Sequence, residues 1–165
     1  MPVINTHQNI AAFLDMLAYA EGSANHPLTK NRGYDVIVTG LDGKREIFTD
    51  YRDHPFASGR PAKVFNRRGE KSTASGRNQQ LYLFWPHYQK QLALPDFSPL
   101  SQDKLAIQLI RECRALDELH QGRIERAISR CRNIWASLPG AGYGQREHSL
   151  EELVTVWRTA GGVLA

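Results

Sequence analysis

One glutamate of this sequence stands on a helix face where the pattern calls for an apolar residue. The segment 10–22 reads IAAFLDMLAYAEG, and one face of an α-helix here collects Ile10, Phe13, Leu14, Leu17 and Ala18. Glu21 is the next position on that face, and Gly22 supplies a helix stop. Burial raises the pKa of a carboxyl group because it disfavours the charged form, and a raised pKa suits a general acid near neutral pH. By position alone, a solvated or structurally paired glutamate is the commoner interpretation.

Other catalytic chemistries have no matching motif. The sequence contains no P-loop, no dinucleotide fingerprint, no HExxH pair and no GxSxG elbow, and its six histidines are scattered. The glycosidase pattern fits better, because it needs a protonated carboxylic acid beside a groove with polar and aromatic groups. We therefore expect neither a metal nor a cofactor.

Length and hydropathy favour one soluble domain over residues 1–165. No apolar run is long enough to cross a bilayer, which argues against stable membrane insertion. The N-terminus lacks the charged and apolar regions of a signal peptide, so we expect folding in the cytoplasm of the producing cell.

Positive charge is concentrated in one stretch of a chain whose net charge is +4. Between positions 60 and 77 a single acid, Glu70, accompanies the basic residues Arg60, Lys63, Arg67, Arg68, Lys71 and Arg77. Such a stretch favours a polyanionic partner, either nucleic acid or an anionic cell-wall polymer. A solvated basic loop is the simpler alternative.

The first half of the chain predicts a helix, a hairpin, a long loop and a second helix. The first helix begins near Asn5 or Thr6 and ends at Gly22. A hairpin over 35–51 surrounds an Asp-Gly pair, and residues 52–71 have no periodicity. The next helix, kinked or divided at Pro86, has a face that we interpret as core and that contains Leu81, Phe84, Trp85, Tyr88 and Leu92.

The second half predicts three more helices. One is capped by Ser98 or Ser101 and buries Leu105, Leu109, Ile110 and Cys113, and a turn-containing segment over 116–122 follows it. Another spans 123–135 and is broken by the glycine-rich 138–145, and the last starts at the capping box SLEE and ends at Gly161 and Gly162. The pattern is an α+β fold, mostly helical with one small hairpin after the first helix. Cys113 and Cys131 are expected to be reduced thiols, and a bridge between them stays open.

Several segments of the chain closely resemble the lambda-type endolysins, the lambda lysozyme family. They include AFLDMLAYAEG from Ala12, NRGYDVIV from Asn31, FTDYRDHP from Phe48, KQLALPDFSPLSQD from Lys90 and RNIWASLPGAGYGQREH from Arg132. The match runs from about Ile10 to Gly162, and the chain is also similar to the endolysins of P2-like temperate phages. The resemblance implies a lysozyme-like fold.

The resemblance also implies a lytic transglycosylase that serves host cell lysis. This family cleaves the β-1,4 bond between N-acetylmuramic acid and N-acetylglucosamine, and the muramic C6 hydroxyl closes on C1 to give a 1,6-anhydro sugar. Glu21 matches the catalytic glutamate, and a single acid suffices because the nucleophile belongs to the substrate. The alternatives are a hydrolytic muramidase, a weakened or inactive wall-binding variant and, from charge alone, a nucleic-acid-binding protein.

Substrate contacts are implied in the same way. Two lips over the sugar groove correspond to about 52–71 and 135–145, and the substrate-binding residues would be Thr73, Asn78, Gln79, Tyr143 and Gln145. We expect a monomer that binds peptidoglycan glycan strands and no nucleic acid. It would need a holin, as the membrane-permeabilising partner, to leave the cytoplasm of the host bacterium and act in the periplasm.

Two positions depart from the family pattern. Asn78 replaces an aromatic residue in the turn Ser75–Gln79, beside the groove that the family implies. Cys113-Arg114 stands where relatives commonly have an Arg-Gly pair. An arginine in the left-handed conformation of that glycine would cost about 1 kcal/mol.

Overall fold

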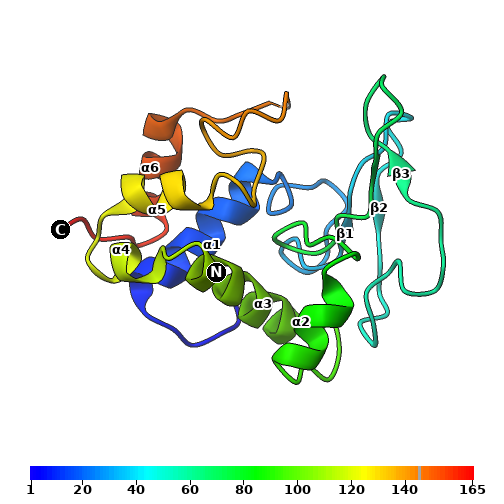
Figure 1. Ribbon diagram of the computed structural model, residues 1–165, viewed down its shortest axis with the longest axis horizontal. Helices are drawn as coiled ribbons and strands as arrows, with labels where there is room; N and C mark the ends of the chain where they lie inside the picture. Colours follow the sequence, from blue (N-terminus) through cyan, green and yellow to red (C-terminus); the bar gives the residue numbers. More distant parts are fainter. Residues whose placement is uncertain (145) are drawn as a thin grey trace. The chain divides into compact units, whose positions relative to one another are not determined.

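The computed structural model describes residues 1–144 and 146–165 (Figure 1). In chain order the elements are α1 (Gln8–Ala20), β1 (Val36–Ile37), β2 (Glu46–Ile47), β3 (Lys63–Val64), β4 (Lys71–Ser72), α2 (Trp85–Gln91), α3 (Pro99–Glu112), α4 (Leu116–His120), α5 (Ile124–Cys131) and α6 (Leu150–Thr159). Helices with short antiparallel strands confirm the α+β prediction.

The chain divides into two compact units. We call residues 1–21 with 103–165 the helical unit, and residues 22–102 the loop unit. The single domain expected over residues 1–165 stays a prediction.

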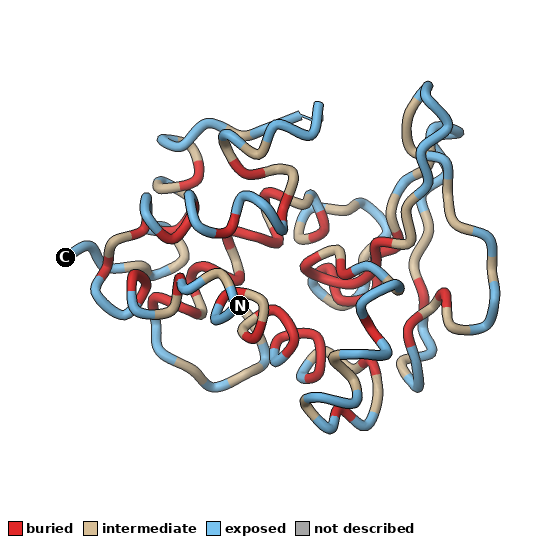
Figure 2. Tube along the Cα trace, viewed as in Figure 1, coloured by how far each residue is buried: buried red, intermediate tan, exposed pale blue. Residues whose placement is uncertain are grey.

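Helix α1 forms the centre of the helical unit, where it packs against α4 and α6. The apolar face predicted from sequence is buried, and so are Ala12 and Met16 on other sides of the helix. The run of buried residues along α1 is visible in Figure 2. A helix that is apolar nearly all round is typical of a core position, so α1 can hold its C-terminal end in a defined place.

The two ends of α1 differ in how well sequence predicted them. The helix starts at Gln8, after His7, whose ring nitrogen accepts a hydrogen bond from the backbone N–H of Asn9. The predicted caps Asn5 and Thr6 were therefore wrong, because histidine is not among the favoured capping residues. At the other end, Gly22 has a φ of 69° and stops the helix directly after Glu21, as predicted.

The loop unit contains two small antiparallel sheets. Strands β1 and β2 pair Val36 with Ile47, which confirms the hairpin predicted over 35–51. Strands β3 and β4 pair Lys63 with Ser72, so the segment 52–71 is not the structureless loop that we predicted. Two-residue strands are too short to leave a periodic signal, which is why the sequence did not reveal them.

A tight turn over residues 75–80 is fastened to the start of α3. Gln102 accepts a hydrogen bond from the backbone N–H of Arg77 at 2.9 Å and donates to the backbone oxygens of Tyr34 and Phe97. A Cβ atom on Gly76 would lie 2.1 Å from the Gln102 side-chain oxygen. Only glycine fits there, so the turn that carries Asn78 and Gln79 has a defined position within the loop unit.

Helix α2 corrects one prediction. The helix begins at Trp85, so Pro86 lies in its first turn, where proline is tolerated. The described residues of α2 therefore contain no kink at Pro86. Trp85 is buried and its indole N–H donates to Asp53 at 2.6 Å, but Leu81 and Phe84 are 39% and 52% exposed. The core interpretation was wrong for these two residues because a turn precedes the helix and interrupts its periodicity.

The remaining helices follow the predicted order with shifted ends. Helix α3 begins at Pro99, which agrees with the Ser98 alternative, and the 116–122 segment contains the short helix α4 rather than only a turn. Helix α5 ends at Cys131, four residues before the predicted end. Ser149 caps α6 by accepting the Glu152 N–H, as the SLEE motif predicted. Cys113 is half-buried and Cys131 buried, both as free thiols.

No helix of the described residues is long and apolar enough to cross a membrane. In the same part of the chain, no group of three or more histidine, cysteine, aspartate and glutamate residues is placed to hold a metal ion.

Arg114 provides a test of backbone strain. Its φ is 57°, the left-handed region predicted from the missing glycine. Arg114→Gly is expected to stabilise the protein by about 1 kcal/mol, because glycine carries no Cβ penalty there. Arg111→Gly, within α3, is the matched control and is expected to destabilise it by about 1 kcal/mol. Urea unfolding measures both, and destabilisation by both variants would contradict the strain assignment.

Candidate active site

Glu21 lies at the C-terminal end of α1 with its carboxyl group held by one hydroxyl. Ser137 Oγ donates to Glu21 Oε1 at 2.6 Å. Burial raises the pKa of the Glu21 carboxyl to about 7, although the Ser137 hydrogen bond and the charge of His148 act in the opposite direction. The sequence-based expectation of an acid with a raised pKa therefore agrees with the geometry.

Ser137 was not among the residues singled out from sequence. It lies in the segment after α5, between the buried side chains of Trp135 and Leu138. The Trp135 N–H donates to the Cys131 oxygen, and the Leu138 N–H donates to the Trp135 oxygen. A small hydroxyl residue between two anchored apolar residues was the available signal, but its partner Glu21 lies 116 positions away in the chain.

The glycine-rich segment after Ser137 is organised by a second carboxylate. Glu147 accepts backbone N–H bonds from Gly140 and Gly142, both at 2.8 Å, and these bonds lower its pKa. Tyr143 is 52% exposed, and its hydroxyl donates to the Asn133 backbone oxygen at 3.0 Å. Tyr143 and Glu21 thus both belong to the helical unit, whereas the predicted site residue Gln145 lies outside the described residues.

Three further predicted site residues belong to the loop unit. Thr73 is half-buried, and its hydroxyl oxygen accepts the N–H of Tyr82 at 3.0 Å. Gln79 is half-buried in a left-handed conformation, and its amide donates to the Gly76 oxygen. Asn78 is buried. Asn78 and Gln79 therefore share the turn over 75–80, and Thr73 lies just before it in the loop unit.

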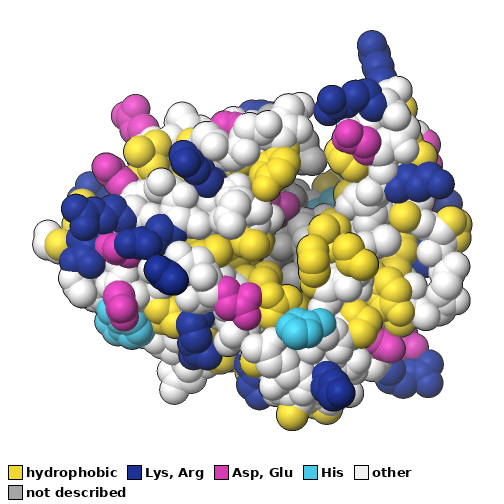
Figure 3. All heavy atoms as spheres, viewed as in Figure 1, with side chains coloured by type: hydrophobic (Ala, Val, Ile, Leu, Met, Phe, Trp, Pro, Cys, Tyr) yellow, Lys and Arg dark blue, Asp and Glu magenta, His cyan; other side chains and the backbone are white. Residues whose placement is uncertain are grey.

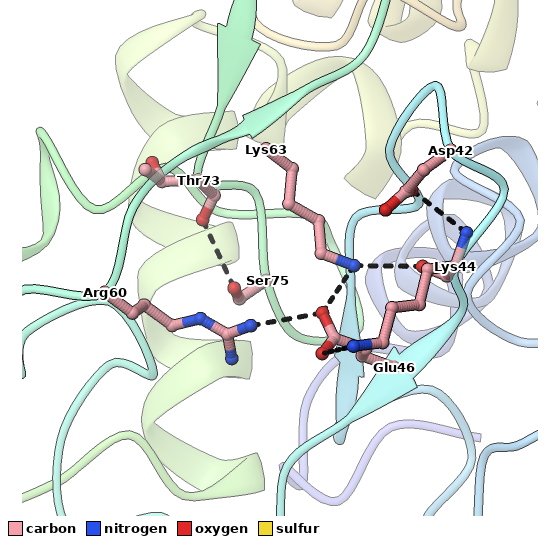
Figure 4. A network of polar contacts seen from close by, with 7 residues as sticks. All are labelled: Asp42, Lys44, Glu46, Arg60, Lys63, Thr73 and Ser75. Carbon is pink, nitrogen blue, oxygen red and sulfur yellow. Dashed lines mark hydrogen bonds and ion pairs between the residues drawn. The ribbon is translucent and has the colours of Figure 1, made fainter.

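The basic stretch does not form one patch. Figure 4 shows Arg60 and Lys63 directed at Glu46 of β2, with Lys44 beside them. The hydrogen bond from Lys63 is the main reason that the Glu46 pKa is lowered. Sequence suggested Glu70 as the one acid among these residues, but strand pairing supplies Glu46 as another.

The other basic residues of this stretch divide between the interior and the surface. Arg77 is buried, with its guanidinium 5.3 Å from the centre of the Tyr34 ring. Arg67, Arg68 and Lys71 are exposed at the β3–β4 hairpin, and Figure 3 shows basic side chains there. A polyanion would therefore meet fewer accessible cations than the sequence suggested.

The burial of Glu21 has a measurable effect on stability. The pKa of this acid is raised from 4.5 to about 7 in the folded protein, so between these values the native state binds more protons than the unfolded state, and stability falls as pH rises. At pH 8 we expect the free energy of unfolding of Glu21→Gln to exceed that of the parent by up to about 3 kcal/mol. At pH 4 we expect no such difference.

Chemical denaturation at the two pH values measures this difference. Glu125→Gln, which removes an exposed carboxylate of α5, is the control and should show no such gain. Equal stability of Glu21→Gln and the parent at pH 8 would mean that the Glu21 carboxylate is not desolvated.

Comparisons with known proteins place the chain in a single family. The family model described as Endolysin matches residues 11–164. The endolysin of Escherichia phage P2 is 90% identical over 165 residues, which cover all of both chains. The endolysin of Escherichia phage lambda is 52% identical over 154 residues, which cover 93% of this chain and 91% of that protein.

Solved structures agree with the sequence comparisons. A structure of bacteriophage lambda lysozyme complexed with a chitohexasaccharide matches with a TM-score of 0.87 and 48% identity, covering 99% of this chain and 100% of that one. A second structure, lysozyme from bacteriophage lambda, matches with a TM-score of 0.83 and 47% identity over the same shares. The family resemblance and the lysozyme-like fold predicted from sequence are thereby confirmed.

Proposed function

Because the chain belongs to the endolysin family, we propose that it degrades peptidoglycan as a lytic transglycosylase with Glu21 as acid and base. The observation that carries the proposal is the Glu21 carboxyl, held by Ser137 and with a pKa near neutrality. At such a pKa both the protonated and the ionised form are accessible, and a residue that first donates and then accepts a proton needs both.

The proposed reaction has two proton transfers through one residue. Protonated Glu21 donates its proton to the glycosidic oxygen as the bond from that oxygen to the muramic C1 breaks. The muramic C6 hydroxyl then attacks C1, and the ionised Glu21 accepts the proton of that hydroxyl. The products are a free N-acetylglucosamine hydroxyl and a 1,6-anhydromuramic end, no water is consumed, and Glu21 returns to its starting form.

The surroundings of Glu21 favour this route over hydrolysis. Hydrolytic glycosidases pair the acid with a second carboxylate, which activates water or attacks the sugar. Burial is the largest cause of the raised Glu21 pKa, so a carboxylate neighbour is not needed to explain it. A single acid with an internal nucleophile accounts for this arrangement more simply.

Substrate contacts are proposed for the residues that the resemblance assigns to substrate binding. Thr73 and Gln79 offer partly accessible polar groups, and Tyr143 offers an exposed aromatic ring, on which sugars stack. Asn78 would support the turn from within, and Gln145 completes the set from the sequence. That a lambda lysozyme has been solved with a chitohexasaccharide supports a glycan ligand. We further propose that the protein acts as a monomer and reaches the wall after a holin permeabilises the membrane.

Muropeptide mass spectrometry of digested sacculi tests the reaction. We expect products with 1,6-anhydromuramic ends, each lighter by one water than the hydrolytic product. Reducing muramic ends would instead identify a hydrolytic muramidase and overturn the transglycosylase mechanism.

The role of Glu21 is tested by substitution. Glu21→Gln removes the proton donor but keeps the shape of the side chain, so wall clearing should fall by a factor on the order of 10²–10⁴. Glu125→Gln serves as the control and should clear walls at the parent rate. Clearing by Glu21→Gln at the parent rate would refute the proposed acid.

A further inference from the structure

We propose that His148, held by Glu152 and Tyr19, is a positioning residue that tunes the proton on Glu21 and thereby the pH range of the enzyme. The inference rests on the proposed acid/base role of Glu21. All of the residues concerned belong to the helical unit.

The backbone of His148 is joined to the serine that holds the acid. The His148 N–H donates to the Ser137 backbone oxygen at 3.0 Å, and the Ser137 hydroxyl donates to Glu21 at 2.6 Å. His148 therefore fixes the segment that presents the Ser137 hydroxyl. A displacement of His148 would be transmitted to the acid through this one residue.

The side chain of His148 is held from two helices. Its Nδ1 lies 3.1 Å from one carboxylate oxygen of Glu152, in the first turn of α6. The other oxygen of Glu152 accepts the Tyr19 hydroxyl at 2.6 Å. Tyr19 belongs to α1, two residues before Glu21, and its ring centre is 5.4 Å from that of His148. Helices α1 and α6 thus confine the imidazole between a carboxylate and an aromatic ring.

Charged groups surround the His148 imidazole. Glu152 faces it from α6, and the pKa of Glu152 is lowered by hydrogen bonds from Tyr19 and His148, so this carboxylate is ionised near neutral pH. From the preceding loop, the positive charge of Arg146 acts on Tyr19, and the charge of His148 acts on Glu21 at the end of α1. A positive charge on His148 favours the ionised form of Glu21, because opposite charges attract.

This effect opposes the burial of Glu21. Burial raises the pKa of the acid, whereas the His148 charge and the Ser137 hydrogen bond lower it. A transglycosylase acid must also act as a base, so a pKa raised by burial alone would impair the second proton transfer. The triad Tyr19, Glu152 and His148 thus keeps Glu21 able to accept a proton as well as to donate one.

A direct measurement of the Glu21 pKa tests the inference without relying on activity. The folded protein is labelled with ¹³C at the glutamate carboxyl carbons and titrated by NMR, and Glu21→Gln assigns the signal. We expect His148→Gln to raise the Glu21 pKa by about 0.5 to 1 unit, because a nearby positive charge is lost. Tyr19→Phe keeps the ring but removes the hydroxyl, and it should give a smaller rise.

Glu152→Gln distinguishes an effect of Glu152 that acts through His148 from a direct electrostatic effect of Glu152 on Glu21. Removing a negative charge would by itself lower the pKa of a neighbouring acid. If Glu152 acts by holding His148 in place beside Ser137, its loss must instead raise the Glu21 pKa. Glu151→Gln, which removes an exposed carboxylate one position earlier on α6, is the matched control and should leave the Glu21 pKa unchanged.

The pH dependence of wall clearing gives the second readout. In His148→Gln and Glu152→Gln, the alkaline limb of the pH–rate profile should move to higher pH by the same amount as the Glu21 pKa measured by NMR. A purely structural loss would instead lower the rate equally at every pH. An unchanged Glu21 pKa in folded His148→Gln, or a fall in Glu152→Gln, would overturn the inference. Should His148→Gln fail to fold, Glu152→Gln and Tyr19→Phe decide it. Full clearing by Glu21→Gln would refute the proposed function instead, and the NMR shifts would still be readable.

Discussion

The hydrogen bond between Ser137 and Glu21 joins two distant parts of the chain at the point where a carboxyl group is buried. Burial of that group is unfavourable for its ionised form, so the position must be maintained by the rest of the helical unit. Helix α1 provides this support because its apolar residues are buried nearly all round, and Gly22 ends the helix directly after the acid. The buried core therefore supports an acid whose ionisation destabilises the folded protein. In the proposed mechanism, the same acid catalyses the reaction.

The loop unit is organised by polar side chains rather than by long strands. Gln102 is fully buried and joins the turn over 75–80 to the backbone at Tyr34 and Phe97, and Gly76 leaves the space that this amide needs. Two-residue strands contribute few ladder hydrogen bonds, so a buried amide with several partners makes a large contribution to local order. The same turn carries Asn78 and Gln79, two of the proposed substrate-binding residues.

Family membership and residue chemistry contribute different parts of the functional argument. The Endolysin match and the relatives from phages P2 and lambda establish the family, while the route of bond cleavage depends on what surrounds one acid. In the proposed mechanism, a single carboxyl with a pKa near 7 suits a substrate that supplies its own nucleophile. The proposed choice of transglycosylase over hydrolase therefore rests on the environment of Glu21, because the relatives' names, endolysin and lysozyme, do not distinguish the two reactions.

The sequence by itself determined the features that depend on near neighbours in the chain. These include the helix that presents Glu21, its stop at Gly22, the 35–51 hairpin and the SLEE cap, each set by local backbone preferences. Tertiary structure decided what depends on long-range contacts. It paired Ser137 with Glu21 across 116 positions, gave Arg60 and Lys63 the partner Glu46, and left Leu81 and Phe84 exposed. Periodicity reports only which residues share a face, whereas packing decides whether that face is covered and which polar groups meet.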